Sequence, residues 1–185
     1  MKVLIVKNIA RESPDLLMEI LEENKIEFYI YEYEKDRVFP SPEDYGAIFV
    51  FGGPDSANDE TEKMIKEING VKKFLAKKIP YFGICLGLQV MVKALGGEIR
   101  KNPIKEIGWR DPKDSIFKVN LTDEGKKDPI FDGIESGYVA TAVTSYGTSD
   151  IKSVYGLVGT ASTFSADVVQ SNKSTIGVAL ISPEA

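Results

Sequence analysis

One cysteine stands between two glycines in a segment that could carry nucleophilic catalysis. Cys85 follows a buried apolar run and precedes a helical pattern, so we expect it at a strand-to-helix turn, flanked by Gly83 and Gly87. Such a turn raises a nucleophile above the sheet and requires small neighbours, as in nucleophile elbows. The N-terminus of the following helix favours the thiolate and offers N–H groups to a developing oxyanion. A lone cysteine is more often a buried small hydrophobe, but the flanking glycines and the position favour a nucleophile.

A second glycine pair follows another apolar run. Gly52 and Gly53 end the run 47–51 and begin a Gly-Gly-Pro-Asp-Ser loop. Ligands of open α/β sheets bind at the carboxyl ends of the strands, where this loop is expected. Two glycines let the backbone approach a ligand, so their N–H groups are candidates for an oxyanion hole. A plain surface loop is the alternative, unless the strand order places this loop beside Cys85.

The residue types that are missing restrict the chemistry. The chain of 185 residues has no histidine, which excludes imidazole as a base, metal ligand or proton shuttle. A single cysteine permits neither an internal disulfide nor a thiolate zinc cluster, so no metal and no cofactor are expected. No Gly-x-x-x-x-Gly-Lys-[Ser/Thr] or Gly-x-Gly-x-x-Gly motif is present, which argues against a nucleotide-binding module.

Charge and hydropathy narrow the choice of partners. The net charge of −5 argues against nucleic acid as the main partner. No apolar run approaches about 18 residues and no signal peptide is visible, so no membrane association is expected. Free cysteine and the absence of a leader predict a cytoplasmic location.

Strand and helix patterns alternate in the first part of the chain. Short apolar or β-branched runs predict strands at 2–6, 27–31, 47–51 and 79–84. Apolar residues spaced three or four apart predict helices that start after a Ser13 N-cap and over 61–78 and 86–95. This alternation predicts an α/β fold, a mostly parallel central sheet with helices on both faces. The charged residues of 60–78 are expected to form a solvated helix face.

The composition changes near Glu135. Residues 1–135 hold 21 of the 23 Lys and Arg and 25 of the 28 Asp and Glu, whereas 136–185 hold 15 Ser and Thr against 6 before. Short β-prone runs at 138–144, 157–163 and 176–180 predict a β-rich C-terminal part that adds strands to the sheet. Fifty residues would make a marginal domain, so 1–185 is expected to form one domain.

The run Gly-Ile-Cys-Leu-Gly-Leu-Gln at 83–89, together with Phe-Gly-Gly-Pro-Asp-Ser at 51–56, resembles the class I glutamine amidotransferase family. Segment 106–109 resembles stand-alone amidotransferase-like members, and 128–134 resembles an element of the GMP synthetase glutaminase subunit. The resemblance implies a flavodoxin-like domain that hydrolyses glutamine to glutamate and ammonia. The ammonia would pass to an acceptor site on a synthetase subunit or a fused domain.

The resemblance also implies roles for individual residues. Cys85 would attack the side-chain amide of glutamine. The backbone N–H of Leu86 and one from Gly52 or Gly53 would hold the oxyanion, and Gln89 would help to seat the substrate.

The sequence departs from the family pattern at the base. The family's base is the His of a Gly-Val-Gln-Phe-His-Pro-Glu motif, which segment 177–184 matches with one residue more. Ser182 occupies the His position and Glu184 keeps the acid, while Tyr146 stands where relatives have a second His. A serine cannot take a proton from a thiol near neutral pH, because its hydroxyl is not basic enough.

Three interpretations of this departure stay open. In the first, the chain has lost its base and serves as a binding or regulatory module. In the second, Tyr146 or Glu184 has become the base. In the third, 136–185 is not the natural sequence, as after a frameshift.

A function of another class is that of the intracellular protease superfamily, which also uses cysteine elbows. Its members place a His directly after the Cys, where this chain has Leu86.

Overall fold

The computed structural model describes residues 2–101, residue 114 and six strand segments at 118–120, 138–139, 146–149, 155–158, 162–163 and 177–181. The elements up to residue 101 are β1 (Lys2–Lys7), α1 (Asp15–Glu23), β2 (Glu27–Glu32), a 3₁₀ turn (Pro42–Asp44), β3 (Ala47–Val50), α2 (Glu62–Ala76), β4 (Tyr81–Ile84), α3 (Leu86–Ala94) and β5 (Glu98–Lys101). The later strands are β6 (Lys118–Asn120), β7 (Tyr138–Val139), β8 (Tyr146–Ser149), β9 (Tyr155–Val158), β10 (Ser162–Thr163) and β11 (Gly177–Ile181).

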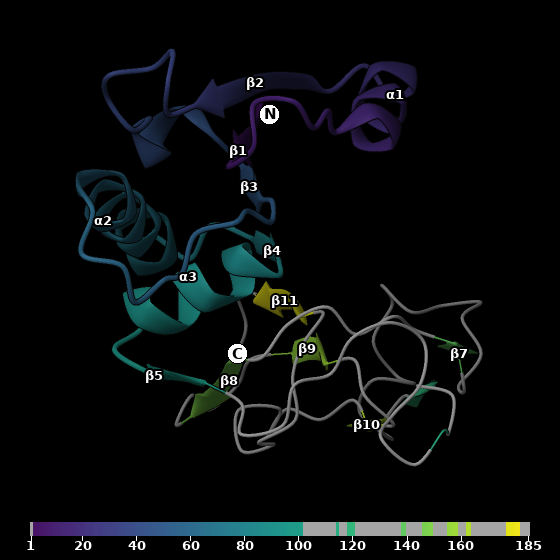
Figure 1. Cartoon of the computed structure of the whole chain (residues 1–185). Helices are drawn as coiled ribbons and strands as arrows, with labels where there is room; N and C mark the ends of the chain where they lie inside the picture. The colour runs from purple at the N-terminus through teal and green to yellow at the C-terminus, as the bar shows by residue number, and fades with distance from the viewer. Residues whose placement is uncertain are drawn as a thin grey trace.

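The central sheet has the order β2-β1-β3-β4-β11-β9 (Figure 1). The four strands from β2 to β4 run parallel to one another, as the strand–helix alternation predicts. Strand β11 joins antiparallel to β4 and carries β9 on its other side, so the C-terminal part does add strands to the sheet. The mostly parallel flavodoxin-like sheet is therefore confirmed.

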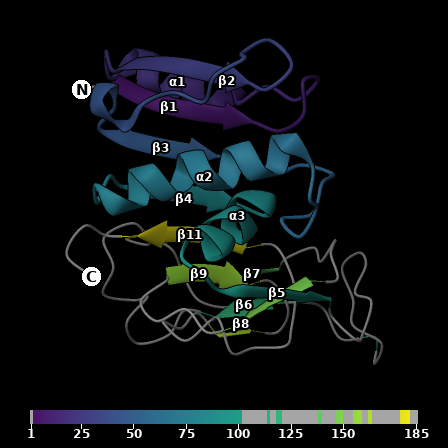
Figure 2. The same cartoon turned by 90° about the vertical axis from the view of Figure 1, so that its left-hand side faces the viewer.

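Alternate residues of β1 face opposite sides of the sheet and meet different helices. Val3 and Ile5 pack in one apolar cluster with Leu21 of α1. Leu4 and Val6 belong to the larger cluster that includes the buried faces of α2 and α3. Figure 2 shows α2 and α3 in front of the sheet and α1 behind it. This arrangement confirms helices on both faces, and it follows from the two-residue period of a strand buried on both sides.

The ends of several elements differ from the expected ones. Helix α1 begins at Asp15 with Pro14 at the N-cap and no side-chain cap, so the expected Ser13 cap is wrong. Helix α2 does begin with a cap, because the Thr61 hydroxyl accepts a hydrogen bond from the Met64 N–H at 3.2 Å. Strand β5 was not expected, since Ile99 is its one apolar residue and no alternation is visible there.

None of the helices within the described part of the chain is both long enough and apolar enough to cross a membrane.

Candidate active site

Cys85 occupies a strained turn between β4 and α3. Its backbone has φ 53° and ψ −104°, and α3 begins at the next residue, Leu86. Positive φ is uncommon for a residue other than glycine and costs of order 1–3 kcal/mol, so surrounding structure must enforce it. The expected placement of Cys85 at a strand-to-helix turn is confirmed.

Two glycines make room for this turn. A Cβ atom on Gly87 would lie 2.1 Å from the carbonyl oxygen of Val50, at the end of β3. A Cβ atom on Gly83 would lie 2.7 Å from the carbonyl carbon of Gly87. The buried Tyr81 hydroxyl donates a hydrogen bond of 2.7 Å to the Gly87 carbonyl oxygen and ties the start of α3 to β4. The first turn of α3 is thus pressed against β3 and β4 at a distance that only glycine permits.

The glycine loop after β3 lies directly beside the thiol. A Cβ atom on Gly52 would lie 3.4 Å from the Cβ and 4.0 Å from the Sγ of Cys85. A Cβ atom on Gly53 would lie 3.0 Å from Cδ2 of Leu86 and 2.7 Å from Cβ of Asn8. Strands β3 and β4 are parallel neighbours, so their carboxyl ends meet at one edge of the sheet. The structure therefore brings the two sequence-predicted glycine motifs together.

The thiol is shielded from solvent, and this changes its chemistry. Cys85 is half-buried, and burial raises the pKa of its thiol above the ordinary value. A hydrogen bond from the Leu86 N–H to the sulfur opposes this effect and lowers the pKa, but burial is the larger cause. The start of α3 does favour the thiolate through the Leu86 N–H, as expected, but the loss of solvation outweighs this donor and the pKa is raised overall.

Gln89 lies one turn along α3 from the cysteine. Its N–H donates to the carbonyl oxygen of Cys85 at 3.2 Å, so the two residues share one side of the helix. The side chain is 6% exposed, and its buried Oε1 accepts no hydrogen bond from the described part of the chain. A buried acceptor without a partner costs about 1–3 kcal/mol, which a bound donor would recover.

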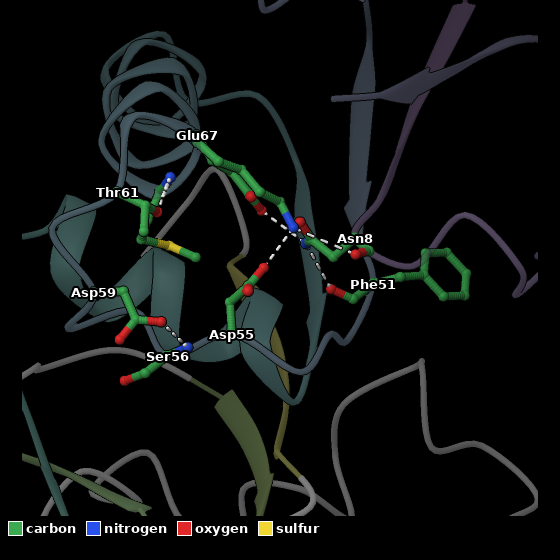
Figure 3. Close-up of polar contacts among 9 residues, drawn as sticks. Asn8, Phe51, Asp55, Ser56, Asp59, Thr61 and Glu67 are labelled. Carbon is green, nitrogen blue, oxygen red and sulfur yellow. Dashed lines mark hydrogen bonds and ion pairs between the residues drawn. The ribbon is translucent and has the colours of Figure 1, made fainter. Parts of the chain in front are cut away.

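A buried carboxyl group lies beneath the glycine loop. Glu67 of α2 is 3% exposed and accepts a hydrogen bond of 2.9 Å from Nδ2 of Asn8, which also donates to the Phe51 carbonyl oxygen at 3.2 Å (Figure 3). Burial raises the pKa of Glu67 to about 7, although the Asn8 hydrogen bond opposes the shift. The expectation of a solvated charged face on 60–78 is therefore wrong at this position. The spacing to Met64 and Val71, three residues before and four after, places Glu67 on the buried stripe of α2 and was a visible signal in the sequence.

The positions expected to supply the base and its acid, Ser182 and Glu184, lie outside the described residues and stay predictions. The strand before them, β11, ends at Ile181, which pairs with Tyr81 at the start of β4. Cys85 follows the other end of β4. Strand β11 therefore ends at the edge of the sheet opposite to the thiol.

The remaining sequence-predicted segments are described only in part. Tyr146 is the first residue of β8, whose backbone pairs antiparallel with β5. Segments 106–109 and 128–134 lie outside the described residues. Within the described ranges, no three carboxylate, thiol or imidazole groups come together to hold a metal ion.

Comparison with known proteins points to one family. The family model "Glutamine amidotransferase class-I" matches residues 11–154. A subunit of the glutamine-hydrolyzing GMP synthase of Sulfurisphaera tokodaii is 41% identical over 81 residues, 44% of this chain and 38% of the relative. The corresponding GMP synthase subunit of Sulfolobus acidocaldarius is 33% identical over 100 residues, 54% of this chain and 46% of the relative. The matches thus span less than half the length of these relatives.

A solved structure supports the fold independently. The crystal structure of a glutamine amidotransferase from Thermotoga maritima is similar with a TM-score of 0.68 at 21% identity. The similarity covers 84% of this chain and 65% of that chain.

Proposed function

Since the chain belongs to the class I glutamine amidotransferase family, we propose that it binds glutamine and presents Cys85 to the side-chain amide as a nucleophile. The observation that carries this proposal is the position of the Gly52 backbone against Cys85, with the sulfur 4.0 Å from a Cβ built on Gly52. A strained nucleophile with backbone N–H groups beside it is the arrangement that acyl transfer needs.

The reaction would proceed through a tetrahedral intermediate on the sulfur. Cys85 Sγ bonds to the amide carbon of glutamine, and the amide oxygen takes the negative charge. The Leu86 N–H, which donates to the sulfur at rest, would be one donor to that oxygen, and a loop N–H at Gly52 or Gly53 would be the second. Collapse breaks the carbon–nitrogen bond, and the nitrogen leaves as ammonia after gaining the proton that the thiol gave up. Water then cleaves the thioester to glutamate and the free Cys85 thiol.

The proton transfers in these reaction steps have no imidazole to carry them. The chain contains no histidine, and the Cys85 thiol has a raised pKa, so most of it is protonated near neutral pH. We propose that glutamine is bound and that turnover is severely impaired, with Gln89 holding the substrate and Glu184 in the family's acid position. A binding or regulatory module is the second candidate, and the missing histidine favours it.

The relatives suggest where any ammonia would go. Two of them are named as subunits of a glutamine-hydrolyzing GMP synthase. We propose that a synthetase is the partner of this chain and that the location is cytoplasmic, where a single unpaired cysteine stays reduced.

The proposal is tested with a chloroketone analogue of L-glutamine, whose chloride the Cys85 sulfur displaces to form a thioether. We expect the L-analogue to label the native protein at least about tenfold faster than its D-enantiomer, a difference of about 1.4 kcal/mol. We also expect L-glutamine to protect the thiol. Equal rates for the two enantiomers together with no protection by glutamine would overturn the proposed binding function.

A further inference from the structure

Two side chains of α2 hold the glycine loop from beneath at both of its ends. At one end, Glu67 accepts from the Asn8 amide, and that amide donates its second hydrogen to the Phe51 carbonyl oxygen. At the other end, Lys63 pairs with Asp55 at 2.5 Å and also donates to the main-chain oxygen of Asn8 at 3.3 Å. Figure 3 shows the Asn8 amide between the Glu67 carboxyl group and the Phe51 carbonyl group. We call Asn8, Asp55, Lys63 and Glu67 the α2 brace.

The part of the loop between these anchors is the part that lies beside the thiol. A Cβ atom on Gly52 would meet Cys85, and a Cβ atom on Gly53 would meet both the Leu86 side chain and Cβ of Asn8. Glycine has the widest choice of backbone conformations, so neither residue fixes the direction of its own N–H group. The restraint has to come from the anchors on either side.

The burial of Glu67 is difficult to explain as a contribution to stability. Removing a carboxyl group from water is costly, and an apolar residue in the same stripe of α2 would pack without that cost. Glu67 is nevertheless 3% exposed, and it accepts a hydrogen bond from Asn8. Both amide hydrogens of Asn8 are thereby committed, so the amide plane is fixed between α2 and the end of β3.

We propose that Asn8 and Glu67, supported by Lys63 and Asp55, are positioning residues that hold the Gly52–Gly53 backbone in the geometry that receives the oxyanion. This inference rests on the proposed function of Cys85. It adds to that function the residues that would position the oxyanion donors, through contacts that start on α2 and reach the Gly52–Gly53 loop.

The test compares chloroacetone and iodoacetamide, two small alkylating reagents without a glutamine side chain, on the same thiol of the full chain. In the reaction with a chloroketone the thiolate first adds to the carbonyl carbon and forms an oxyanion. The sulfur then moves to the neighbouring carbon, chloride leaves, and the carbonyl group re-forms beside the new thioether. Iodoacetamide instead loses iodide by direct attack at its iodine-bearing carbon and needs no oxyanion donors. The ratio of the two second-order rate constants therefore reports the donors, and thiol exposure and pKa divide out of it. A purely structural role for the α2 brace would not change this ratio.

Asn8→Ala removes the amide and keeps the Cβ that lies beside Gly53. We expect this variant to lower the ratio about 10- to 100-fold, because a displacement of about 1 Å in a catalytic group can cost a hundredfold. The matched control is Asn69→Ala, at an exposed position of the same helix α2, and it should leave the ratio within about twofold of wild type. An unchanged ratio in folded Asn8→Ala protein would overturn the inference.

Glu67 is tested by a pair of substitutions of similar size. Glu67→Gln keeps an oxygen that can accept from Asn8 and should retain most of the ratio, whereas Glu67→Leu removes the acceptor and should behave like Asn8→Ala. If Glu67→Leu does not fold, Asn8→Asp takes its place, because it turns both donors of the amide into acceptors and should lower the ratio as well. A folded Glu67→Leu protein, or a folded Asn8→Asp protein, with the wild-type ratio would overturn the inference.

The same data separate this inference from the function on which it rests. A wild-type preference for the L-analogue that survives in Asn8→Ala with an unchanged ratio overturns the positioning role alone. Loss of enantiomer preference and of glutamine protection in the wild-type protein overturns the proposed function, and the positioning role with it.

Discussion

Residues 2–101 and residues 136–185 differ in what they contribute to the candidate site. The first region holds the thiol, the glycine loop, the buried Gln89 amide and the α2 brace. The second holds no histidine and only 2 Lys and 3 Asp or Glu, with Ser182 at the position expected for the base and Glu184 at the position expected for its acid. The comparison shows that the first region by itself brings the Cys85 thiol and the Gly52–Gly53 loop together, whereas the second region adds strands β11 and β9 to the sheet beside β4.

Substitutions can distinguish the contributions of the two regions. Substitutions in the first region should alter the free energy of unfolding and the reactivity of the thiol. Substitutions at the family's base and acid positions in the second region should alter neither.

Gly87→Ala should have the largest effect. Its Cβ would lie 2.1 Å from a backbone oxygen of β3, which no side-chain rotation can relieve. We expect the free energy of unfolding to fall by about 4 kcal/mol or more, beyond the usual 1–3 kcal/mol of overpacking. Urea denaturation measures the change, with Asn69→Ala as the surface control; a loss below about 1 kcal/mol would show that β3 and α3 are not pressed together.

Glu67→Gln should change how stability depends on pH. The pKa of Glu67 is raised from 4.5 to about 7 in the folded protein, so between these values the folded state binds more protons than the unfolded state. Stability contributed by the neutral carboxyl group is therefore lost as pH rises through this window. Relative to wild type, we expect Glu67→Gln to gain up to about 3 kcal/mol between pH 4.5 and pH 8.

Urea denaturation at a series of pH values measures the Glu67 effect. Lys63 lowers the pKa of Glu67 and Asp55 raises it, so both must be left intact in the comparison. Glu62→Gln is the control, because the Glu62 side chain is 83% exposed on the same helix. Parallel pH curves for wild type and Glu67→Gln would contradict the buried position of Glu67.

Alkylation of Cys85 by iodoacetamide should be slower in the native protein than in the urea-unfolded protein. Burial raises the pKa of the thiol and limits access to it, so we expect a severalfold lower rate near pH 7.5 and a pH–rate curve displaced to higher pH. A faster native reaction would show that the Leu86 N–H and the start of α3 dominate over burial after all.

Ser182→Ala and Glu184→Gln should have the smallest effect. Neither residue is expected to act as a base for the thiol, so labelling by the L-glutamine chloroketone should stay within about twofold of wild type. A drop of an order of magnitude or more in either variant would show that 136–185 has rebuilt a base at these positions.

The alternation of strands and helices was predictable because each pattern is local. The two-residue period of β1 and the three-to-four-residue spacing in α2 are visible in short windows of sequence. The Cys85 turn was predictable from the same patterns, since the strand pattern ends just before Cys85 and the helix pattern starts just after it. For that reason Gly83 and Gly87 could be predicted to lie at a crowded turn, although the sequence did not indicate that Val50 is the residue that crowds Gly87.

The features that escaped prediction depend on contacts between distant parts of the chain. Asn8 and Glu67 are 59 positions apart, and their hydrogen bond exists because α2 packs over the end of β1. The raised pKa of Cys85 likewise depends on solvent exclusion within the folded structure. The effect of the helix start on the thiol pKa could be predicted from local sequence, but the larger effect of burial could not.

The central claim is that this chain holds the nucleophile but lacks its base. The most direct test measures ammonia release from L-glutamine by protein whose intact mass agrees with 20.4 kDa. Loss of the base from a related catalytic triad lowers kcat by about a millionfold, so we expect no release above the background of the assay. The same protein should still bind one equivalent of the L-glutamine chloroketone. Robust ammonia release by protein of that mass would contradict the central claim. Robust release by protein of a different mass would show instead that 136–185 is not the natural sequence.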